Sequence, residues 1–255
     1  MDLSFLVPEA APIVRKAANI YVKHTKPWFI GLVVHGSALK GGFIPGCSDV
    51  DFQLYLEDSV FTAQRQLPLK LGLAIHRDLA ELDPSPFRYI QCDPQSTNLP
   101  EDYVGPIPGA YQLLAGRLPV PEATQEQLQD AARKALAELI PIPPFITGEL
   151  LDHGSGRLSG KIRLLITKIW PTLYHILTLQ QDDAIYTWNQ TKEQAIELLP
   201  KDTQLSGTIH DFYQTVRLYY PTEEGIEGGL RVIEAGIRFL KAAKSWWEEL
   251  DETHP

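Results

Sequence analysis

The chain has 255 residues, of which 44% are hydrophobic and 22% are charged, and its formal net charge at pH 7 is −9. This length allows one large domain or two modest ones, and the composition is that of a soluble globular protein. The negative charge disfavours a long nucleic-acid-binding surface, which would be basic. It is compatible with a cationic small substrate, and also with the general acidity that keeps many cytosolic proteins soluble.

Neither the apolar stretches nor the first residues indicate a membrane or secreted protein. The longest apolar runs are far shorter than the about 20 residues that cross a bilayer. The start "MDLSFLVPEAAP" lacks the basic region and apolar core of a signal peptide. The two cysteines, Cys47 and Cys92, form neither a disulfide framework nor a zinc signature. We therefore expect a cytoplasmic protein without membrane contacts. We also expect a monomer or homodimer.

The first hundred residues predict alternating helices and strands. Apolar residues three to four apart over 11–25 predict an amphipathic helix. The continuous apolar run 28–36, which closes on glycine, predicts a buried strand. Alternating apolar and polar residues over 49–57 predict a strand with one polar face. A helix over 60–82 and a third strand over 86–93 complete this part.

The rest of the chain is predicted to be mostly helical. Residues 94–121 contain six prolines and three glycines, which predict a connecting segment with one short helical patch at 109–117. Apolar residues at helical spacing predict five helices further on: 122–140, 160–180, 191–199, 206–220 and 227–250. The expected organisation is a small domain of strands and helices, a connector and a helical bundle, over 1–105, 106–121 and 122–255.

Two aspartates stand two residues apart at the start of the strand predicted over 49–57. Side chains at positions i and i+2 of a strand project from the same face, so Asp49 and Asp51 lie side by side. Their like charges repel, and burying them is costly unless a cation lies between them. Carboxylates on a rigid strand suit Mg²⁺, which takes its remaining ligands from water and substrate phosphates. The pair therefore predicts a magnesium site.

A Gly-Ser turn closes the strand that precedes this pair. Gly36 would let backbone N–H groups approach a phosphate, and the Ser37 hydroxyl would add a hydrogen-bond donor. Each feature is common by itself, because Gly-Ser often follows a strand and Asp-x-Asp often caps a solvated strand start. Their order, the glycine-rich loop between them and Ser48 just before the aspartates together predict a nucleoside triphosphate site.

The stretch "HGSALKGGFIPGCSDVDFQLYL" resembles the signature of the polymerase-β-type nucleotidyltransferase superfamily, in which Asp-x-Asp follows Gly-Ser at this distance. It is most similar to the aminoglycoside adenylyltransferases of the streptomycin/spectinomycin type, where Gly-Gly, Pro and Ser-Asp-x-Asp recur. A less specific resemblance links "LLITKIWPTLYHILT…TKEQAIELLP" to the helical C-terminal domain of those enzymes. The resemblance implies an α+β fold, with a small nucleotidyltransferase-type mixed sheet and its helices followed by an all-α helical bundle.

The resemblance also implies roles for residues of the first domain. Asp49 and Asp51 would bind Mg²⁺. Ser37 and Ser48 would hold the triphosphate, and Gly36 would permit its close approach.

In the family, the helical domain supplies basic residues to the triphosphate and an aromatic side chain to the nucleotide. Lys168, Lys192 and Phe239 match these positions. Each has a simpler interpretation as well, as a solvated lysine or as a core aromatic residue at helical spacing.

The reaction that the resemblance implies is in-line attack of a substrate hydroxyl on the α-phosphate of a nucleoside triphosphate, ATP in the adenylyltransferases, with release of pyrophosphate. Catalysis would come from positioning and from neutralisation of charge by Mg²⁺. The partners would be the nucleotide and a small hydroxylated acceptor. If the acceptor is an aminoglycoside-like antibiotic, the activity would confer antibiotic resistance.

One part of the family pattern is missing. In the family, a third carboxylate, on the strand after the helix, takes the hydroxyl proton. The aligned position here carries Arg88, with Tyr89 and Gln91 beside it, and the first carboxylate is Asp93 at the end of the predicted strand. We predict Asp93 as the third catalytic residue. The alternatives are another base, or a catalytically degenerate nucleotide-binding or regulatory protein of the same fold.

Overall fold

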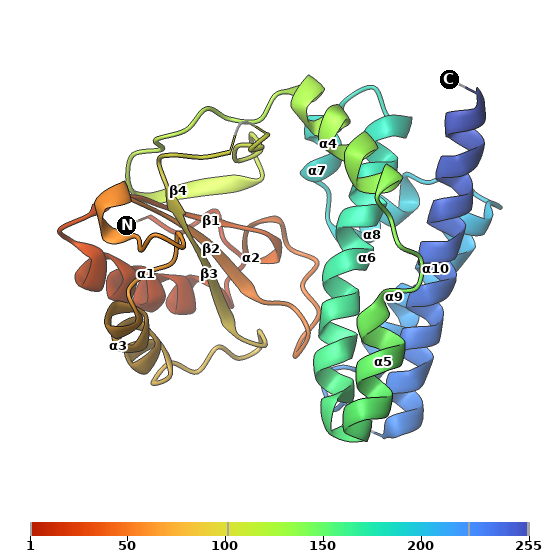
Figure 1. Cartoon of the computed structure of the whole chain (residues 1–255), viewed down its shortest axis with the longest axis horizontal. Helices are drawn as coiled ribbons and strands as arrows, with labels where there is room; N and C mark the ends of the chain where they lie inside the picture. Colours follow the sequence, from red (N-terminus) through yellow and green to blue (C-terminus); the bar gives the residue numbers. More distant parts are fainter. Residues whose placement is uncertain (1, 101, 224, 254–255) are drawn as a thin grey trace. The chain divides into compact units, whose positions relative to one another are not determined.

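The computed structural model describes residues 2–100, 102–223 and 225–253. Its contacts divide the chain into two compact units, Met1–Ala123 and Thr124–Pro255. The first unit holds a mixed sheet with helices, and the second is helical (Figure 1). The predicted α+β class, a mixed sheet with helices followed by an all-α bundle, is confirmed.

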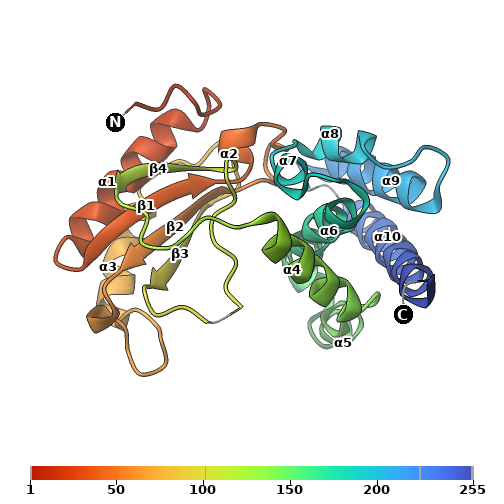
Figure 2. The same cartoon turned by 90° about the horizontal axis from the view of Figure 1, so that it is seen from above.

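A four-stranded sheet in the order β3-β2-β1-β4 forms the centre of the first unit (Figure 2). β1 (Phe29–His35) pairs antiparallel with β2 (Val50–Leu56) on one side and with β4 (Tyr111–Gly116) on the other. β3 (Ile90–Ser96) runs parallel to β2. Because β1 has a strand on each side, its middle residues are buried, which accounts for its continuously apolar sequence.

Two helices, α1 (Ala11–Thr25) and α3 (Leu69–Leu79), contribute apolar side chains to the core on one face of this sheet. Tyr21 of α1 meets Phe52 of β2 edge-on, with ring centroids 5.3 Å apart. The other even-numbered residues of β2 are buried in the same core. Since side chains alternate along a strand, Asp51 and Gln53 point to the opposite face. That face is polar.

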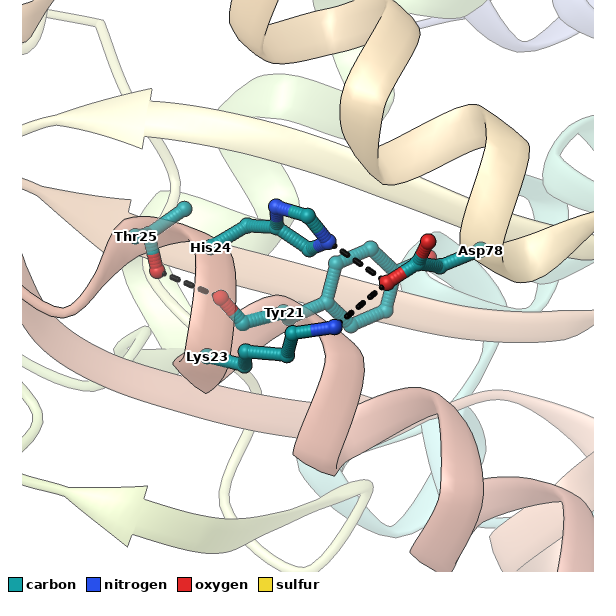
Figure 3. Close-up of polar contacts among 5 residues, drawn as sticks. All are labelled: Tyr21, Lys23, His24, Thr25 and Asp78. Carbon is teal, nitrogen blue, oxygen red and sulfur yellow. Dashed lines mark hydrogen bonds and ion pairs between the residues drawn. The ribbon is translucent and has the colours of Figure 1, made fainter.

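Hydrogen bonds also link α1 to α3 (Figure 3). Asp78 of α3 accepts one from Lys23 Nζ at 2.9 Å and one from His24 Nε2 at 2.8 Å. These contacts, the Lys23 bond first, lower the pKa of Asp78. Thr25 Oγ1 donates to the Tyr21 carbonyl at 2.7 Å within the last turn of α1. The two helices are therefore connected by these hydrogen bonds as well as through the core.

Two predictions for the middle of the first unit are wrong in their bounds. The helix expected over 60–82 consists of the short 3-10 helix η1 (Asp58–Val60) and of α3, with a turn between them that ends at Pro68. The third strand begins at Ile90 instead of residue 86, because Phe87 N–H donates to the Pro84 carbonyl in a turn. The strand consequently extends beyond Asp93.

The helical patch expected over 109–117 is wrong in type. This segment forms β4, whose backbone groups pair with β1 along the edge of the sheet. Its apolar residues suit a helix as well as a strand, and the open edge of β1 decides in favour of the strand. The segment 106–121, expected as a connector, thus contributes a strand to the sheet of the first unit.

The second unit is a helical bundle. Its helices are α4 (Gln125–Ala137), α5 (Pro144–His153), α6 (Leu158–Gln180), α7 (Ala184–Trp188), α8 (Lys192–Glu197), α9 (Gln204–Tyr219) and α10 (Ile226–Thr253), with the 3-10 helix η2 (Gly154–Arg157) before α6. All five predicted helices are present, and α5 and α7 are additional. α10 packs closely on α6 at Gly236, which has no side chain. A Cβ at this position would stand 2.7 Å from a methyl carbon of Leu165. Within the described ranges, none of these helices combines the length and apolar character needed to cross a bilayer.

Candidate functional site

Gly36, directly after β1, adopts a backbone conformation that other residues avoid. Its φ is 74° and its ψ is −153°, a region in which essentially only glycine is found. A Cβ at this position would stand 2.5 Å from Asp51 Oδ2. The backbone of Gly36 therefore lies directly against the Asp51 carboxylate, and any side chain here would displace one of the two.

A single helical turn, α2 (Ser37–Lys40), follows Gly36. The backbone N–H of Lys40 donates to the Gly36 carbonyl at 3.0 Å, and that of Gly41 donates to the Ser37 carbonyl at 3.0 Å. Ser37 is buried, and Lys40 is half-buried. The turn keeps Ser37 and Lys40 close to the end of β1.

Ser48 closes the same loop just before β2. Its Oγ accepts a hydrogen bond from the Ile44 N–H at 2.9 Å, and its carbonyl accepts one from the Arg88 N–H at 2.7 Å. The Arg88 side chain is exposed. Since a hydroxyl can accept and donate at once, Ser48 can hold the loop and still donate its proton to a phosphate oxygen.

The register of the strands collects polar side chains on the face that α1 and α3 leave uncovered. Asp51 pairs with His35 of β1 and with Gln91 of β3, and Gln53 pairs with Asp93. Register partners point to the same side of a sheet. His35, Asp51 and Asp93 therefore share one face.

The pKa of His35 depends on several charged side chains near it. Burial, followed by the nearby Lys40 ammonium, lowers the pKa of His35, while the carboxylates of Asp49 and Asp93 act in the opposite direction. His35 is thus neutral at pH 7. Lys40, Asp49 and Asp93 all lie within electrostatic reach of the same imidazole, so they belong to one neighbourhood.

The residue beside Asp51 on β3 is Gln91, and this alignment corrects the one made from the sequence, which put Arg88 there. Asp93 lies two residues further along, inside β3 and not at its end, with an exposed side chain. Asp93 Oδ2 accepts a hydrogen bond from Gln95 Nε2 at 2.5 Å. A carboxylate is therefore present on the correct face, but an amide occupies the position next to Asp51.

The polar face also carries a hydrogen-bond network that the sequence did not indicate. Tyr55 Oη donates to Gln53 Oε1 at 2.8 Å, and Gln53 Nε2 donates to Tyr103 Oη at 3.0 Å. Tyr103 belongs to the segment between β3 and β4, so the network holds that segment on the sheet. Tyr103 lies in a proline-rich stretch without periodicity. The one signal available was the alternation along β2, which puts Gln53 and Tyr55 on the same face as Asp51.

Three predicted site residues belong to the second unit. Lys168 is exposed on α6. Lys192 begins α8, and its ammonium lies 5.7 Å from the centre of the Trp170 ring. Phe239 of α10 is fully buried, with 0% of its surface exposed. Phe239 therefore fits a packing role, because a nucleotide could reach its ring only after the bundle had repacked.

The donor set suits a magnesium ion that arrives with a substrate. Asp49 and Asp51 are both half-buried, and Asp51 lies against the glycine turn. In the part of the chain that the structure describes, no three acidic, histidine or cysteine side chains cluster into a complete metal site. Mg²⁺ commonly takes one or two protein carboxylates and completes its shell with water and substrate phosphates. Two carboxylates fit that mode, and do not fit a resident structural metal such as zinc.

No protein-family model matches the chain, and no curated protein matches it in sequence. One similar solved structure is the crystal structure of spectinomycin adenyltransferase AAD(9) from Enterococcus faecialis with ATP and spectinomycin. Its identity to this chain is 15% and its TM-score 0.48, over 90% of this chain and 98% of that one. This likeness is too weak to assign an activity, and the α+β class follows from the chain's own strands and helices.

Proposed function

We propose that the chain is a nucleotidyltransferase that transfers AMP from ATP to a hydroxyl group of a small acceptor, with release of pyrophosphate. The observation that carries this proposal is the contact between the Gly36 backbone and the Asp51 carboxylate. This contact brings together two features: a turn that a phosphate can approach, and a carboxylate that can hold Mg²⁺. Either feature alone would be a common structural motif.

In this proposal, Asp49 and Asp51 hold Mg²⁺, which when bound supplies positive charge to the phosphates. Gly36 gives the triphosphate access to the backbone of the turn. Ser37 and Ser48 donate hydrogen bonds to it, for which the Ser48 hydroxyl retains its proton. We also propose Lys168 and Lys192 as further phosphate-binding residues, and we leave Phe239 out because it is fully buried.

Asp93 takes the proton of the attacking hydroxyl. Its carboxylate is exposed on the same sheet face as Asp51, so an acceptor bound over that face can reach it.

The acceptor is a small hydroxylated cation of the aminoglycoside type. The net charge of −9 and the carboxylates on the polar face favour a positively charged molecule over an anionic one. The protein acts in the cytoplasm as a monomer or homodimer, where modification of such an antibiotic would confer resistance.

One observation favours a second function. Gln91, whose amide cannot accept the proton of a hydroxyl, is the register partner of Asp51. A protein with this arrangement could bind Mg-ATP and transfer nothing, and so serve as a nucleotide-binding or regulatory protein.

A single set of measurements separates the two functions. The wild type, Asp49→Asn, Asp51→Asn and Asp251→Asn are incubated with Mg²⁺, ATP and a panel of aminoglycosides. Pyrophosphate release and ATP binding are then measured. Asp251 is exposed on α10 and serves as the matched control. We expect release and Mg²⁺-dependent binding in the wild type and the control, and neither in the other two variants.

Two other results would be decisive. Mg-ATP binding without pyrophosphate release for any acceptor would reject the enzyme in favour of the second function. A wild type that binds no ATP would reject both.

A further inference from the structure

Lys40 is the one basic residue in the sequence between Gly36 and Asp49. It ends α2, and its backbone N–H donates to the Gly36 carbonyl at 3.0 Å. The residue is therefore one helical turn away from the glycine that contacts Asp51. It is half-buried, and its ammonium acts on His35 together with Asp49 and Asp93. Both the backbone and the electrostatics put Lys40 in the candidate site.

The charges of the site make a cation at this position important. Asp49, Asp51 and Asp93 bring three carboxylates to one neighbourhood, and Lys40 is the one lysine or arginine that the loop supplies. A triphosphate that entered beside these carboxylates would be repelled, and a Mg²⁺ ion offsets only part of the combined negative charge. A lysine ammonium is a point charge that binds phosphate oxygens through charge-assisted hydrogen bonds.

We propose that the Lys40 ammonium binds the β- and γ-phosphates of the nucleotide, the part that leaves as pyrophosphate. In the proposed reaction the α-phosphate is the one attacked by the acceptor beside Asp51, which leaves the β- and γ-phosphates for Lys40. Lys40 then stabilises the negative charge that develops on the leaving pyrophosphate. This inference rests on the proposed function, since it concerns the same site.

The test measures Kd by isothermal titration calorimetry for ATP, AMP and inorganic tripolyphosphate, each with Mg²⁺. The proteins compared are the wild type, Lys40→Met, Lys40→Arg and Lys70→Met. Lys70 is exposed on α3, which packs on the opposite face of the sheet, and it is the matched control. Loss of a charged hydrogen bond should raise the Kd of Lys40→Met for ATP and tripolyphosphate about 10- to 100-fold. The Kd for AMP should stay within about twofold, Lys40→Arg should recover most of the affinity, and Lys70→Met should match the wild type.

The possible failures are distinguishable. Equal ATP affinity in wild type and Lys40→Met overturns the inference and leaves the proposed function standing. A wild type that binds neither ATP nor tripolyphosphate overturns both. If Lys40→Met loses AMP and ATP affinity equally, or melts at a lower temperature with no selective loss of polyphosphate binding, Lys40 holds the loop and does not bind the phosphates.

Discussion

The Gly36 backbone occupies the space beside the Asp51 carboxylate that a side chain at position 36 would need. The 2.5 Å between Asp51 Oδ2 and a Cβ placed there is far less than a van der Waals contact. The two residues are 15 positions apart in the sequence and meet because β1 and β2 pair antiparallel, with His35 opposite Asp51. The conformation of the turn and the position of the carboxylate therefore depend on each other.

Gly36→Ala should lower both the stability of the protein and its affinity for ATP. The backbone conformation costs a non-glycine residue about 1–3 kcal/mol, which urea denaturation would detect as lost stability. The methyl group would also push Asp51 aside, so Mg²⁺-dependent ATP binding should fall at least tenfold.

The control for this variant is Gly72→Ala in α3, where a Cβ would meet nothing within 4 Å. Alanine at that helical position should stabilise the protein by roughly 0.5–1 kcal/mol and leave ATP binding unchanged. Wild-type stability and ATP affinity in Gly36→Ala would show that the turn tolerates a side chain, and would remove the main support for the proposed site.

Asp93→Asn should separate binding from catalysis. The carboxylate lies two residues from the partner of Asp51 and is exposed, so its loss should leave the Kd for Mg-ATP within about twofold. If Asp93 takes the hydroxyl proton, kcat should fall about 10²- to 10⁴-fold. Steady-state rates of pyrophosphate release would measure this, with Gln95→Met as a variant that removes the hydrogen bond to Asp93 without adding a charge and keeps the Asp93 carboxylate. An unchanged kcat in Asp93→Asn would mean that another group is the base.

Tyr103→Phe should loosen the segment between β3 and β4. The substitution removes the oxygen that accepts the hydrogen bond of Gln53 Nε2, at a cost of about 0.5–1.5 kcal/mol. Amide hydrogen exchange over residues 102–110 should speed up, while exchange in β1 and β2 should not. Tyr186→Phe, on the exposed surface of α7, is the matched control and should behave as the wild type. Unchanged exchange in Tyr103→Phe would show that the network does not hold this segment.

His175 of α6 should make the second unit sensitive to mild acid. Burial lowers the pKa of His175 from 6.5 to about 4, its Nδ1 is buried without a partner among the described residues, and its ring meets Trp188 edge-on. Between these two pH values the unfolded chain binds a proton that the folded chain does not. Stability should therefore be full above pH 6.5 and should decrease as the pH falls toward 4, by up to about 3 kcal/mol.

His175→Gln should flatten that dependence, as seen in urea denaturation at pH 7, 6 and 5. His210→Gln, an exposed residue of α9, should keep the wild-type slope. A slope that is the same in His175→Gln and in the wild type would assign the acid sensitivity to other groups.

The elements that could be predicted from the sequence are those whose pattern is local. α1 is found at the predicted residues because its apolar spacing lies within a single helix. The same holds for the alternation in β2, which put Asp51 on a polar face. β4 could not be predicted, since its six residues, Tyr111–Gly116, have no clear periodicity and become a strand by pairing with β1, some 80 positions earlier.

Within the candidate site, the same distinction applies. The nearness of Gly36 to Asp51 was expected from a strand, a loop and a second strand, which bring the two ends together. Which side chain lies beside Asp51 depends on the register between the parallel strands β2 and β3. β3 starts four residues later than predicted, and the residue beside Asp51 is Gln91 instead of Arg88. Register is decided by the whole set of strand contacts and not by the sequence of one strand.

The position of β4 has a consequence for how the first unit can be made. During synthesis, β1 and β2 leave the ribosome about 60 residues before β4 is complete. Until β4 emerges, the side of β1 that it will pair with is an open strand edge with an apolar sequence. Such an edge pairs readily with other chains. A fragment that stopped at residue 105 would keep that edge permanently and should aggregate, whereas one that continues to Ala123 carries its own closing strand.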